Sequence, residues 1–365
     1  MNSEHKRIAL FGPSIVGGGV ERVMANLCRG LSEEGFAVDL VVLTVKGPYR
    51  DQVPSGVRLV SLMAGRAIGA FLPLVRYLRK ERPSVLISHM NYTNVIAICA
   101  ATSACTGVKV GIVEHGPLSK YITGSFGFRA SLIPLLARWT YPRADRILAV
   151  SQGVADELHT ILGVKAVVVH NPAVLPDLAE RAAEPIDHPW FAPGMPPVVI
   201  SAGRLSAQKD YPTLLRAFRF LIQQREARLV VLGEGEDRAD LLRMTHELGI
   251  ERCVSFPGFV SNPPAYFARS AVFVLSSLWE GQPMVLLEAM GCGTPVVATD
   301  CDYGPSEILE GGKLGKLVRV GDWEGLAQAM DDILHAPPDT GMLKRAAAKY
   351  TLSRVTHNYM EALEI

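Results

Sequence analysis

Two carboxylates, Glu280 and Glu288, bracket the predicted start of a helix within residues 276–309, SSLWEGQPMVLLEAMGCGTPVVATDCDYGPSEIL. Pro283 suits the first helical position, because a residue without an N–H loses no hydrogen bond there. The N–H groups of a helix start lie at the positive end of the helix dipole and favour an anion such as phosphate. Flanking carboxylates accept hydrogen bonds from hydroxyls, so the arrangement predicts a site for a nucleotide-sugar.

The elements around this helix follow from the same stretch. A strand is predicted to end near Leu278, and a second strand is predicted over residues 295–299. Gly291 or Gly293 suits the helix stop. The predicted helix is therefore about two and a half turns long and begins beside Glu280.

Two cations, Arg204 and Lys209, occupy a loop between a predicted strand over residues 198–202 and a helix that Pro212 opens. Two positive charges in such a loop can clamp a diphosphate and neutralise a leaving group. Isolated surface cations would produce the same spacing, so the loop alone leaves both interpretations open.

Two histidines, His89 and His115, stand at the ends of predicted strands over residues 84–89 and 108–116. In open α/β sheets ligands bind beyond the carboxyl ends of the strands, which is where both side chains would lie. Ordinary hydrogen bonding also explains a histidine at a strand end, so a purely structural role is the alternative.

A glycine-rich loop, GPSIVGGGV at residues 12–20, follows the first predicted strand and contains Gly17 and Gly18. Glycines allow the backbone to approach a ligand closely, although a simple tight turn has the same composition. The loop lacks the G-x-G-x-x-G pattern, and residues 44–46 hold no acidic residue at the end of the second strand. Both facts argue against NAD binding. No G-x-x-x-x-G-K-[ST] pattern occurs, which excludes a P-loop.

Predicted strands and helices alternate along the chain, which indicates an α/β fold with doubly wound sheets. In the first half, Ser151 and Gly163 are expected to bound a helix, and residues 165–171 are expected to form the last strand. At 365 residues and 48% hydrophobic content, the chain is long enough to form two cores. Seven prolines within residues 172–197 indicate a connection between domains. We therefore expect an N-terminal domain over residues 1–180 and a C-terminal domain over residues 190–348.

The composition also bounds the location of the protein. No apolar run reaches 18 residues without a charge, proline or glycine, so no membrane span is expected. The N-terminus lacks the apolar body of a signal peptide, which predicts a cytoplasmic protein. The six cysteines have no metal-binding or redox spacing and are expected to be reduced core residues.

The charge is divided unevenly, although the net charge is only +1. Residues 1–171 carry 19 Lys and Arg against 11 Asp and Glu. The segments at residues 65–82 and 126–143 mix basic side chains with large apolar ones. This mixture suits helices that lie on an anionic membrane, whereas core helices with charged rims are the alternative. Nucleic-acid binding is not expected.

The two glutamates belong to a longer pattern, EGQPMVLLEAMGCGTPVVATD, which resembles the signature of the retaining GT-B glycosyltransferases of the group 1 type, family 4. The segments GRLSAQKDY and EHGPLSK are similar to two further motifs of that family. The resemblance covers essentially the whole chain and is densest over residues 198–309. It implies two facing Rossmann-like domains, with a C-terminal helix over residues 350–365 that packs back onto the first domain.

The resemblance also implies roles for individual residues. Arg204 and Lys209 would bind the pyrophosphate, Glu288 the ribose hydroxyls and Glu280 the transferred sugar. His115 would touch the transferred sugar, with His89 as the second choice. The implied catalytic residues are His115, Glu280, Arg204 and Lys209. The implied donor site comprises Gly17, Gly18, Arg204, Lys209, Gly258, Phe259, Val260, Glu280, Gly281, Gln282, Pro283, Met284, Val285 and Glu288.

The implied reaction transfers a hexose or an N-acetylhexosamine with retention of configuration. The donor would be a nucleotide-diphosphate sugar, a UDP-sugar in first place, and the acceptor a lipid-linked saccharide or a polysaccharide precursor such as that of lipopolysaccharide. No cofactor or metal is expected, and Asp300 and Asp302 are interpreted as structural. The enzyme would be peripheral on the inner face of the cell membrane. The alternative hypotheses are an epimerase or hydrolase that acts on the nucleotide-sugar, and a catalytically silent binding subunit.

Overall fold

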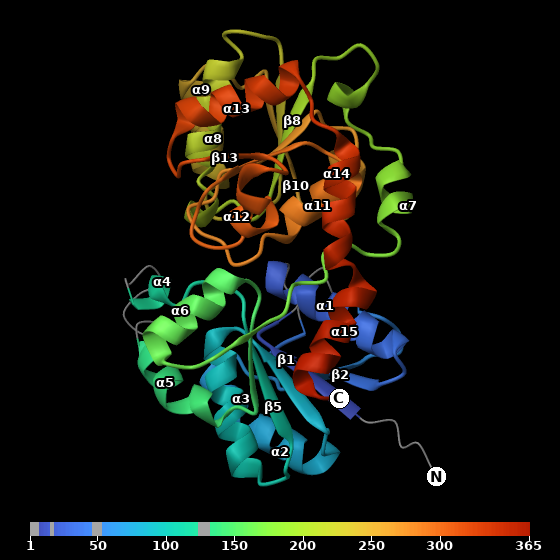
Figure 1. The fold of residues 1–365 in the computed structure, drawn as a ribbon, viewed down its shortest axis with the longest axis vertical. Coiled ribbons are helices and arrows are strands. Elements are labelled where there is room, and N and C mark those ends of the chain that lie inside the picture. The colour runs from blue at the N-terminus through green and yellow to red at the C-terminus, as the bar shows by residue number, and fades with distance from the viewer. Residues whose placement is uncertain (1–6, 15–17, 46–52, 123–131) are drawn as a thin grey trace. The chain divides into compact units, whose positions relative to one another are not determined.

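The computed structural model describes residues 7–14, 18–45, 53–122 and 132–365. The chain divides into two compact units (Figure 1). The first comprises Met1–Pro172 and Leu352–Ile365, and the second comprises Ala173–Thr351. Each unit has its own sheet.

The first unit contains a seven-stranded sheet in which all neighbouring strands are parallel, in the order β3-β2-β1-β4-β5-β6-β7. Its strands are β1 (Arg7–Gly12), β2 (Ala37–Val42), β3 (Arg58–Ser61), β4 (Val85–His89), β5 (Lys109–Glu114), β6 (Arg146–Ala149) and β7 (Val167–Val168). Its helices are α1 (Gly19–Glu33), η2 (Ala67–Ala70), α2 (Phe71–Glu81), α3 (Asn91–Ala104), α4 (Ser119–Ile122), α5 (Ile133–Thr140), η4 (Tyr141–Arg143), α6 (Gln152–Leu162) and α15 (Leu352–Leu363).

The second unit contains a six-stranded parallel sheet in the order β10-β9-β8-β11-β12-β13. Its strands are β8 (Val198–Ala202), β9 (Arg228–Leu232), β10 (Val254–Gly258), β11 (Val272–Leu275), β12 (Val296–Thr299) and β13 (Lys316–Val318). Its helices are α7 (Leu178–Ala183), η5 (Pro189–Phe191), η6 (Ala207–Lys209), α8 (Tyr211–Leu221), α9 (Arg238–Glu247), α10 (Pro263–Phe267), α11 (Met284–Cys292), α12 (Pro305–Ile308), η7 (Glu310–Gly312), α13 (Trp323–His335), α14 (Thr340–Ala347) and η8 (Ala348–Tyr350). The two sheets confirm the predicted α/β class with doubly wound parallel sheets.

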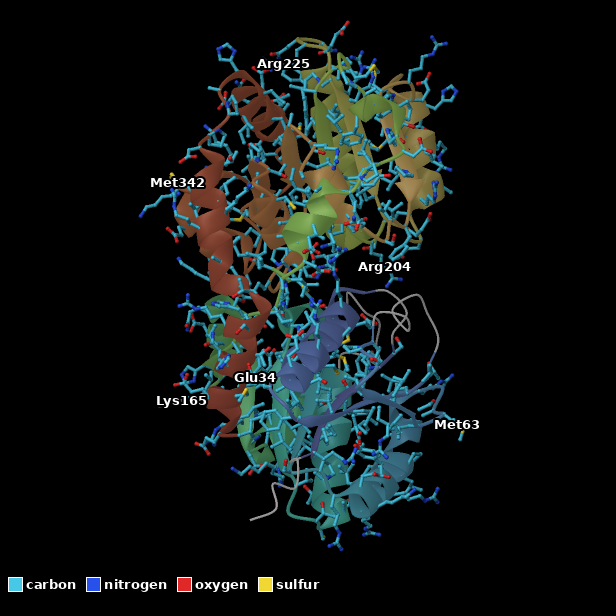
Figure 2. All side chains as sticks on the ribbon, turned by 90° about the vertical axis from the view of Figure 1, so that its right-hand side faces the viewer. Glu34, Met63, Lys165, Arg204, Arg225 and Met342 are labelled. Atoms are coloured by element: carbon cyan, nitrogen blue, oxygen red, sulfur yellow. The ribbon has the colours of Figure 1, made fainter. Side chains whose placement is uncertain are left out.

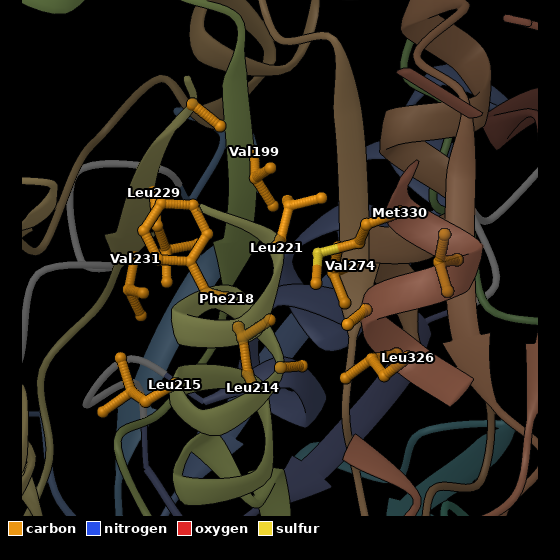
Figure 3. Packing of buried hydrophobic residues seen from close by; sticks show 14 of the residues in the cluster. Val199, Leu214, Leu215, Phe218, Leu221, Leu229, Val231, Val274, Leu326 and Met330 are labelled. Atoms are coloured by element: carbon orange, nitrogen blue, oxygen red, sulfur yellow. The ribbon is translucent and has the colours of Figure 1, made fainter. Parts of the chain in front are cut away.

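The core of the second unit illustrates how the helices cover the sheet. Helices α8 and α13 place their apolar faces against the strands, as helical spacing of apolar residues requires. Burial of each such side chain contributes about 1.5–3 kcal/mol before the entropy cost of folding. Figure 3 shows the packed residues Val199, Leu214, Leu215, Phe218, Leu221, Leu229, Val231, Val274, Leu326 and Met330.

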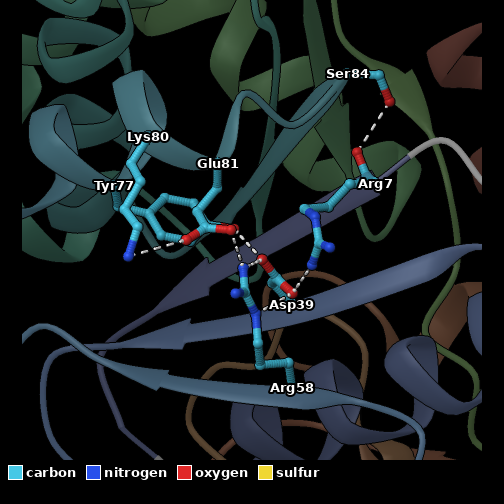
Figure 4. A network of polar contacts seen from close by, with 7 residues as sticks. All are labelled: Arg7, Asp39, Arg58, Tyr77, Lys80, Glu81 and Ser84. Atoms are coloured by element: carbon cyan, nitrogen blue, oxygen red, sulfur yellow. Dashed lines mark hydrogen bonds and ion pairs between the residues drawn. The ribbon is translucent and has the colours of Figure 1, made fainter.

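A buried carboxylate, Asp39, joins four elements of the first unit, namely β1, β2, β3 and α2 (Figure 4). It lies on β2 with no exposed surface and accepts hydrogen bonds from Arg7 at 2.7 Å, from Arg58 at 2.9 Å and 2.5 Å, and from Tyr77 at 2.5 Å. Burial acts to raise the pKa of Asp39, but the hydrogen bonds from Arg58 and Tyr77 and the two guanidinium charges outweigh it and hold the pKa below its usual value. The charge is therefore compensated inside the fold.

The C-terminal helix α15 belongs to the first unit and packs beside α1. The contact is close, since a Cβ on Gly30 of α1 would lie 2.0 Å from Thr356 Oγ1 of α15. Glycine at this position lets the two helices approach each other.

The order of the strands reverses once in each sheet, between β1 and β4 in the first unit and between β8 and β11 in the second. At such a point the loops from neighbouring strands diverge to opposite faces of the sheet, which opens a crevice where ligands bind. The predicted residues Arg204, Lys209 and Glu280 follow β8 and β11, and His89 ends β4.

Three predicted boundaries were wrong by a few residues. Pro283 is the residue before α11, not its first helical residue, and Gly293 terminates the helix with φ of 83°. Strand β11 ends at Leu275 and not near Leu278, because the chain turns away to meet the loop after β8. The apolar run at residues 165–171 pairs only over Val167–Val168.

Candidate active site

The start of α11 is held in place by tight backbone contacts. Pro283 precedes the helix with φ of −71°, close to the angle that its ring requires. Gly304 lies beside it with φ of 90°, and a Cβ at that position would lie 2.7 Å from the Gly281 carbonyl oxygen. Only glycine suits both the conformation and the contact. The first N–H groups of α11 therefore emerge from a closely packed loop.

Polar side chains are buried around this helix start. Glu280, Gln282 and Glu288 are all buried, as are Gly281 and Met284, while Val285 is partly exposed. Burial of charged groups is costly unless they are paired or meet a ligand. One buried carboxylate, Glu280, thus precedes the positive end of α11, and a second, Glu288, lies within the helix.

Glu280 is paired with Lys209. Lys209 Nζ lies 2.5 Å from Glu280 Oε1, and the two side chains are 15% and 7% exposed. Ser277 Oγ donates a hydrogen bond of 2.6 Å to the same oxygen. Both donors therefore converge on Oε1, and no described residue donates to Oε2 of Glu280.

The loop after β8 is fastened to the loop after β11 by its backbone. Ser276 Oγ donates to the Lys209 carbonyl oxygen at 2.7 Å, and Leu278 N donates to the Gln208 carbonyl oxygen at 2.8 Å. Asp210 follows in the left-handed conformation, with φ of 45°, and its carboxylate caps α8 through Thr213 N. These bonds fix where Lys209 leaves the backbone.

Arg204 takes a different partner. Its Nε lies 3.1 Å from Glu236 Oε2, and the Arg204 side chain is 73% exposed at the surface of the second unit (Figure 2). An exposed pair of this kind is screened by water and contributes little to stability. The structure therefore places the two predicted cations on one loop but pairs each with its own carboxylate.

The turn at residues 258–260, which belongs to the implied donor site, follows β10 at the edge of the same sheet. Gly258 has φ of 87°, and a Cβ there would lie 2.6 Å from Glu234 Oε1. Phe259 is exposed and Val260 is partly exposed. The turn thus presents an aromatic ring to solvent, two strands away from Arg204 and Lys209.

His89 and His115 meet in the first unit. His89 Nδ1 and His115 Nε2 are 2.9 Å apart, and the rings stack with centroids separated by 5.2 Å. Burial lowers the pKa of His115 to about 3, and burial together with the neighbouring ring lowers the pKa of His89 well below its usual value. Both rings are therefore neutral at physiological pH.

The glycine loop is only partly described. Gly18 is the residue before α1, in an extended conformation with φ of −91° and ψ of 173°. Gly17 lies outside the described residues. Gly18 follows β1, so it lies at the point where the strand order of the first sheet reverses.

Sequence reasoning missed two residues that shape these contacts. Ser277, three residues before Glu280, orients that carboxylate, and Glu236 pairs with Arg204. The signal for Ser277 was its place in the loop after a buried strand, but serine is common in loops and the pairing depends on the fold. Glu236 gave no signal in the sequence.

Asp300 and Asp302 take part in the backbone structure. The carbonyl oxygen of Asp302 accepts a hydrogen bond from Glu280 N at 3.2 Å, and Asp300 N donates to the Val318 carbonyl oxygen at 2.7 Å. Among the described residues, no three His, Cys, Asp or Glu side chains cluster as metal ligands do.

A cavity of about 450 Å³ lies elsewhere in the second unit, between β13, α13 and α14. Its lining includes Lys316, Asp332, His335 and Met342 and none of the predicted site residues. This cavity is therefore not the candidate active site. The candidate site is identified instead by the buried charged side chains at the strand ends.

Two family models match the chain. The model "Glycosyltransferase Family 4" matches residues 17–175, and the model "Glycosyl transferases group 1" matches residues 183–350. Together they account for most of both units.

Several curated relatives are glycosyltransferases. The chain is 29% identical over 344 residues to the N-acetylgalactosamine-N,N'-diacetylbacillosaminyl-diphospho-undecaprenol 4-alpha-N-acetylgalactosaminyltransferase of Campylobacter jejuni, with 90% of each chain covered. It is 28% identical over 321 residues to the lipopolysaccharide core biosynthesis glycosyltransferase LpsE of Rhizobium meliloti, with 87% of this chain and 86% of the relative covered.

Solved structures share the fold at low sequence identity. HepE from Anabaena in complex with UDP-glucose matches with a TM-score of 0.78 at 19% identity and covers 99% of this chain and 100% of its own. The lipopolysaccharide outer core galactosyltransferase WaaB matches with a TM-score of 0.72 at 20% identity and covers 98% and 99%. The two family models together cover most of the chain, and the two parallel sheets and the relatives agree with them. The chain therefore belongs to the GT-B-fold glycosyltransferases of the group 1 type, family 4.

Proposed function

We propose that this glycosyltransferase transfers a hexose or an N-acetylhexosamine from a nucleotide-diphosphate sugar to a lipid-linked saccharide or a polysaccharide precursor, with retention of configuration. The observation that carries the proposal is the Lys209–Glu280 pair, buried beside the start of α11 where the strand order reverses. A cation, a carboxylate and helix N–H groups in one loop suit a diphosphate that carries a sugar.

Such a site assists the reaction by stabilising the leaving group. Negative charge builds on the diphosphate as the glycosidic bond breaks, and groups aimed at that charge lower the barrier. Lys209, Arg204 and the N–H groups that follow Gln282 would stabilise the departing diphosphate. Glu288 would bind the ribose hydroxyls, and Glu280 would bind the transferred sugar through the oxygen that Lys209 and Ser277 leave open.

The proposed route to retention depends on whether a carboxylate can act as the nucleophile. A double displacement needs a carboxylate on the back face of the sugar, and we assign no residue to that role among those that the structure describes. We propose a front-face route in which the acceptor enters on the side that the diphosphate leaves. Such a route needs no metal when protein cations neutralise the diphosphate.

The donor and acceptor classes are proposed from the relatives. HepE was solved with UDP-glucose, and TarM of S. aureus was solved with UDP, which favours a UDP-sugar. The Campylobacter relative acts on a saccharide linked to diphospho-undecaprenol, and LpsE acts in lipopolysaccharide core biosynthesis. We extend these acceptor classes to this chain.

Membrane contact is proposed from the surface of the first unit. Eight of the fifteen exposed large apolar side chains among the described residues fall within residues 63–72 and 122–139. They are Met63, Ile68, Leu72, Ile122, Leu132, Leu135, Leu136 and Trp139. Met63 is 88% exposed, and Figure 2 shows it at the surface. Such a concentration supports the proposal of an interaction surface.

Basic residues accompany these apolar side chains. Arg66, Arg76, Lys80, Arg138 and Arg143 are exposed on or beside η2, α2 and α5. Helix α3 contacts both α2 and α5, so the two segments flank one helix. Their buried residues, such as Leu74 and Ala137, belong to the core, so each segment has one core face and one exposed face. An anionic lipid surface matches this combination, and the protein would work on the inner face of the cell membrane.

No helix within the described residues is long and apolar enough to cross a bilayer. Residues 126–131 of the second segment lie outside the described residues. The proposed membrane contact therefore rests on residues 63–82, Ile122 and residues 132–143.

A donor screen tests the proposed function. Melting temperatures measured with UDP-sugars and GDP-sugars should rise for the correct donor, because a ligand that binds only the native state stabilises it. The selected donor should then be consumed only when an acceptor is added. Release of free sugar without acceptor would favour a hydrolase, conversion of the donor into an epimer would favour an epimerase, and binding without turnover would favour a silent subunit.

A further inference from the structure

The two histidines of the first unit are brought together by the strand register. His89 ends β4 and pairs in register with Val113 of the neighbouring strand β5, and His115 follows two residues after Val113. His89 has no exposed surface, whereas His115 is partly exposed. One ring is therefore a buried support and the other is open to a ligand.

The hydrogen bond between the rings restricts where the protons lie. It joins His89 Nδ1 to His115 Nε2 at 2.9 Å, so one nitrogen donates and the other accepts. The remaining nitrogen of His89, Nε2, is buried and has no hydrogen-bond partner among the described residues. No described residue is seen to hydrogen-bond His115 Nδ1, and this atom is not among the buried polar atoms that lack partners, so it retains solvent-accessible surface.

Two proton arrangements are possible for neutral rings. If His115 donates through Nε2, then His89 carries its proton on Nε2, which leaves an N–H group buried without an acceptor. If His89 donates through Nδ1, its Nε2 is a bare acceptor, and His115 carries its proton on Nδ1. A buried N–H without a partner is rarer in proteins than an acceptor with unused capacity, so the second arrangement is favoured.

The backbone around His89 holds the ring in this position. Met90, the next residue, has φ of 77° and ψ of 139°, which is unfavourable for a side chain larger than glycine. Thr93 Oγ1 donates to the carbonyl oxygens of His89 and of Met90, the latter at 2.8 Å, and Asn94 N donates to the Met90 carbonyl oxygen at 2.8 Å. Strained residues persist where the surroundings over-determine them, often beside functional groups.

We propose that His89 is a positioning residue that fixes the tautomer of His115, so that His115 presents Nδ1–H as a hydrogen-bond donor to an oxygen of a saccharide bound at this strand end of the first unit. This inference rests on the proposed function for the identity of the ligand, but not for the tautomer. His115 then binds and orients a neutral oxygen acceptor and carries no proton to or from the reacting atoms.

Nitrogen NMR of the protein labelled with ¹⁵N-histidine tests the tautomer directly. The wild type is compared with His89→Leu, which removes the donor at nearly constant volume, and with His89→Asn, whose amide nitrogen can replace Nδ1. His115→Gln assigns the His115 signals, and exposed His159 on α6 serves as the reference for an unconstrained ring. We expect His115 to carry its proton on Nδ1 in the wild type and in His89→Asn. In His89→Leu, we expect the signals of His115 to shift toward the mixture of tautomers that the reference ring of His159 shows.

Kinetics distinguish positioning from a merely structural role. Loss of one fixed hydrogen bond should lower kcat/KM about tenfold in His89→Leu, and His89→Asn should restore most of it. A wild-type His115 protonated on Nε2, or a His89→Leu protein with unchanged tautomer and kcat/KM, would overturn the proposal. If His89→Leu does not fold, the tautomer of His115 in the wild type and in His89→Asn tests the proposal. The predicted tautomer in a protein without transferase activity would support the positioning role and reject the proposed function.

Discussion

Lys209 and Glu280, 71 residues apart in the chain, form an ion pair of 2.5 Å beside the start of α11. Each was predicted to bind a different part of the donor, and in the structure each neutralises the other. Ser277 completes the arrangement by donating to the same carboxylate oxygen. A diphosphate that binds Lys209 would compete with Glu280 for the ammonium, so donor binding and the orientation of Glu280 are coupled.

Removing one member of this pair should destabilise the protein. Lys209→Met leaves the Glu280 carboxylate buried without its cation, and we expect a loss of about 3 kcal/mol in the free energy of unfolding. Lys316→Met is the matched control, because its pair with Asp332 is about half exposed on both sides and should contribute under about 1 kcal/mol. Urea unfolding measures both, and equal losses in the two variants would contradict the special status of the buried pair.

The histidine pair predicts a specific loss of stability in acid. The pKa of His115 is lowered to about 3 by burial, and the pKa of His89 is also lowered. The unfolded chain therefore takes up protons below pH 6.5 that the folded chain does not, and stability is lost as pH falls through this range. Each histidine can contribute up to about 1.4 kcal/mol per pH unit.

His115→Gln should accordingly lose less stability than the wild type between pH 6.5 and pH 5. Burial raises the pKa of nearby Glu114 to about 7, which acts in the opposite direction because its neutral form is favoured in the fold. Glu114 is present in both proteins, so its contribution cancels in the comparison. Exposed His159→Gln serves as the control and should follow the wild-type curve. Superimposable curves for His115→Gln and the wild type would count against a buried neutral pair.

Gly304 should be required for the shape of the donor loop. A Cβ there would meet the Gly281 carbonyl oxygen and Pro283 at 2.7 Å and 2.9 Å, with φ of 90°. Gly304→Ala is expected to weaken donor binding at least about tenfold by displacing the start of α11. Gly311→Ala is the control for a positive φ, since Gly311 lies in the left-handed region with φ of 67° and ψ of 28°, and a Cβ there would contact nothing within 4 Å. Calorimetric titration with the donor should therefore separate the two variants, and similar affinities would refute the packing argument.

The proposed membrane surface predicts binding to anionic vesicles. Leu135→Ser with Trp139→Ser removes two exposed apolar side chains of α5 and should lower the fraction of protein that floats with vesicles containing phosphatidylglycerol. The control pair, Leu242→Ser with Val320→Ser, removes exposed apolar side chains of the second unit and should float like the wild type. Absence of wild-type flotation, or equal flotation of both pairs, would argue against this surface.

Local signals in the sequence predicted much of the fold. Ser151 and Gly163 bound α6 as expected, since Ser151 Oγ accepts from Val154 N and Gly163 adopts φ of 71°. Gly293 likewise ends α11, whereas Pro283 precedes the helix by one residue. These signals act over a few residues, and their physical causes are present in the local sequence.

The pairings within the site were beyond the reach of such signals. Strand order brings Lys209 to Glu280, and strand register brings His89 to His115, whereas the sequence indicated only that each residue followed a strand. The same limit explains residues 165–171, whose apolar composition suited a long strand although only two residues found a partner. Contacts between distant residues depend on topology, which composition and spacing do not encode.

The most direct test measures the affinity for UDP of a double variant, Arg204→Gln with Lys209→Gln, by calorimetry. If the diphosphate binds at the start of α11 against these two cations, the affinity should fall about a hundredfold or more, while exposed Arg216→Gln on α8 should bind like the wild type. A folded double variant that binds UDP within about twofold of the wild type would contradict the account.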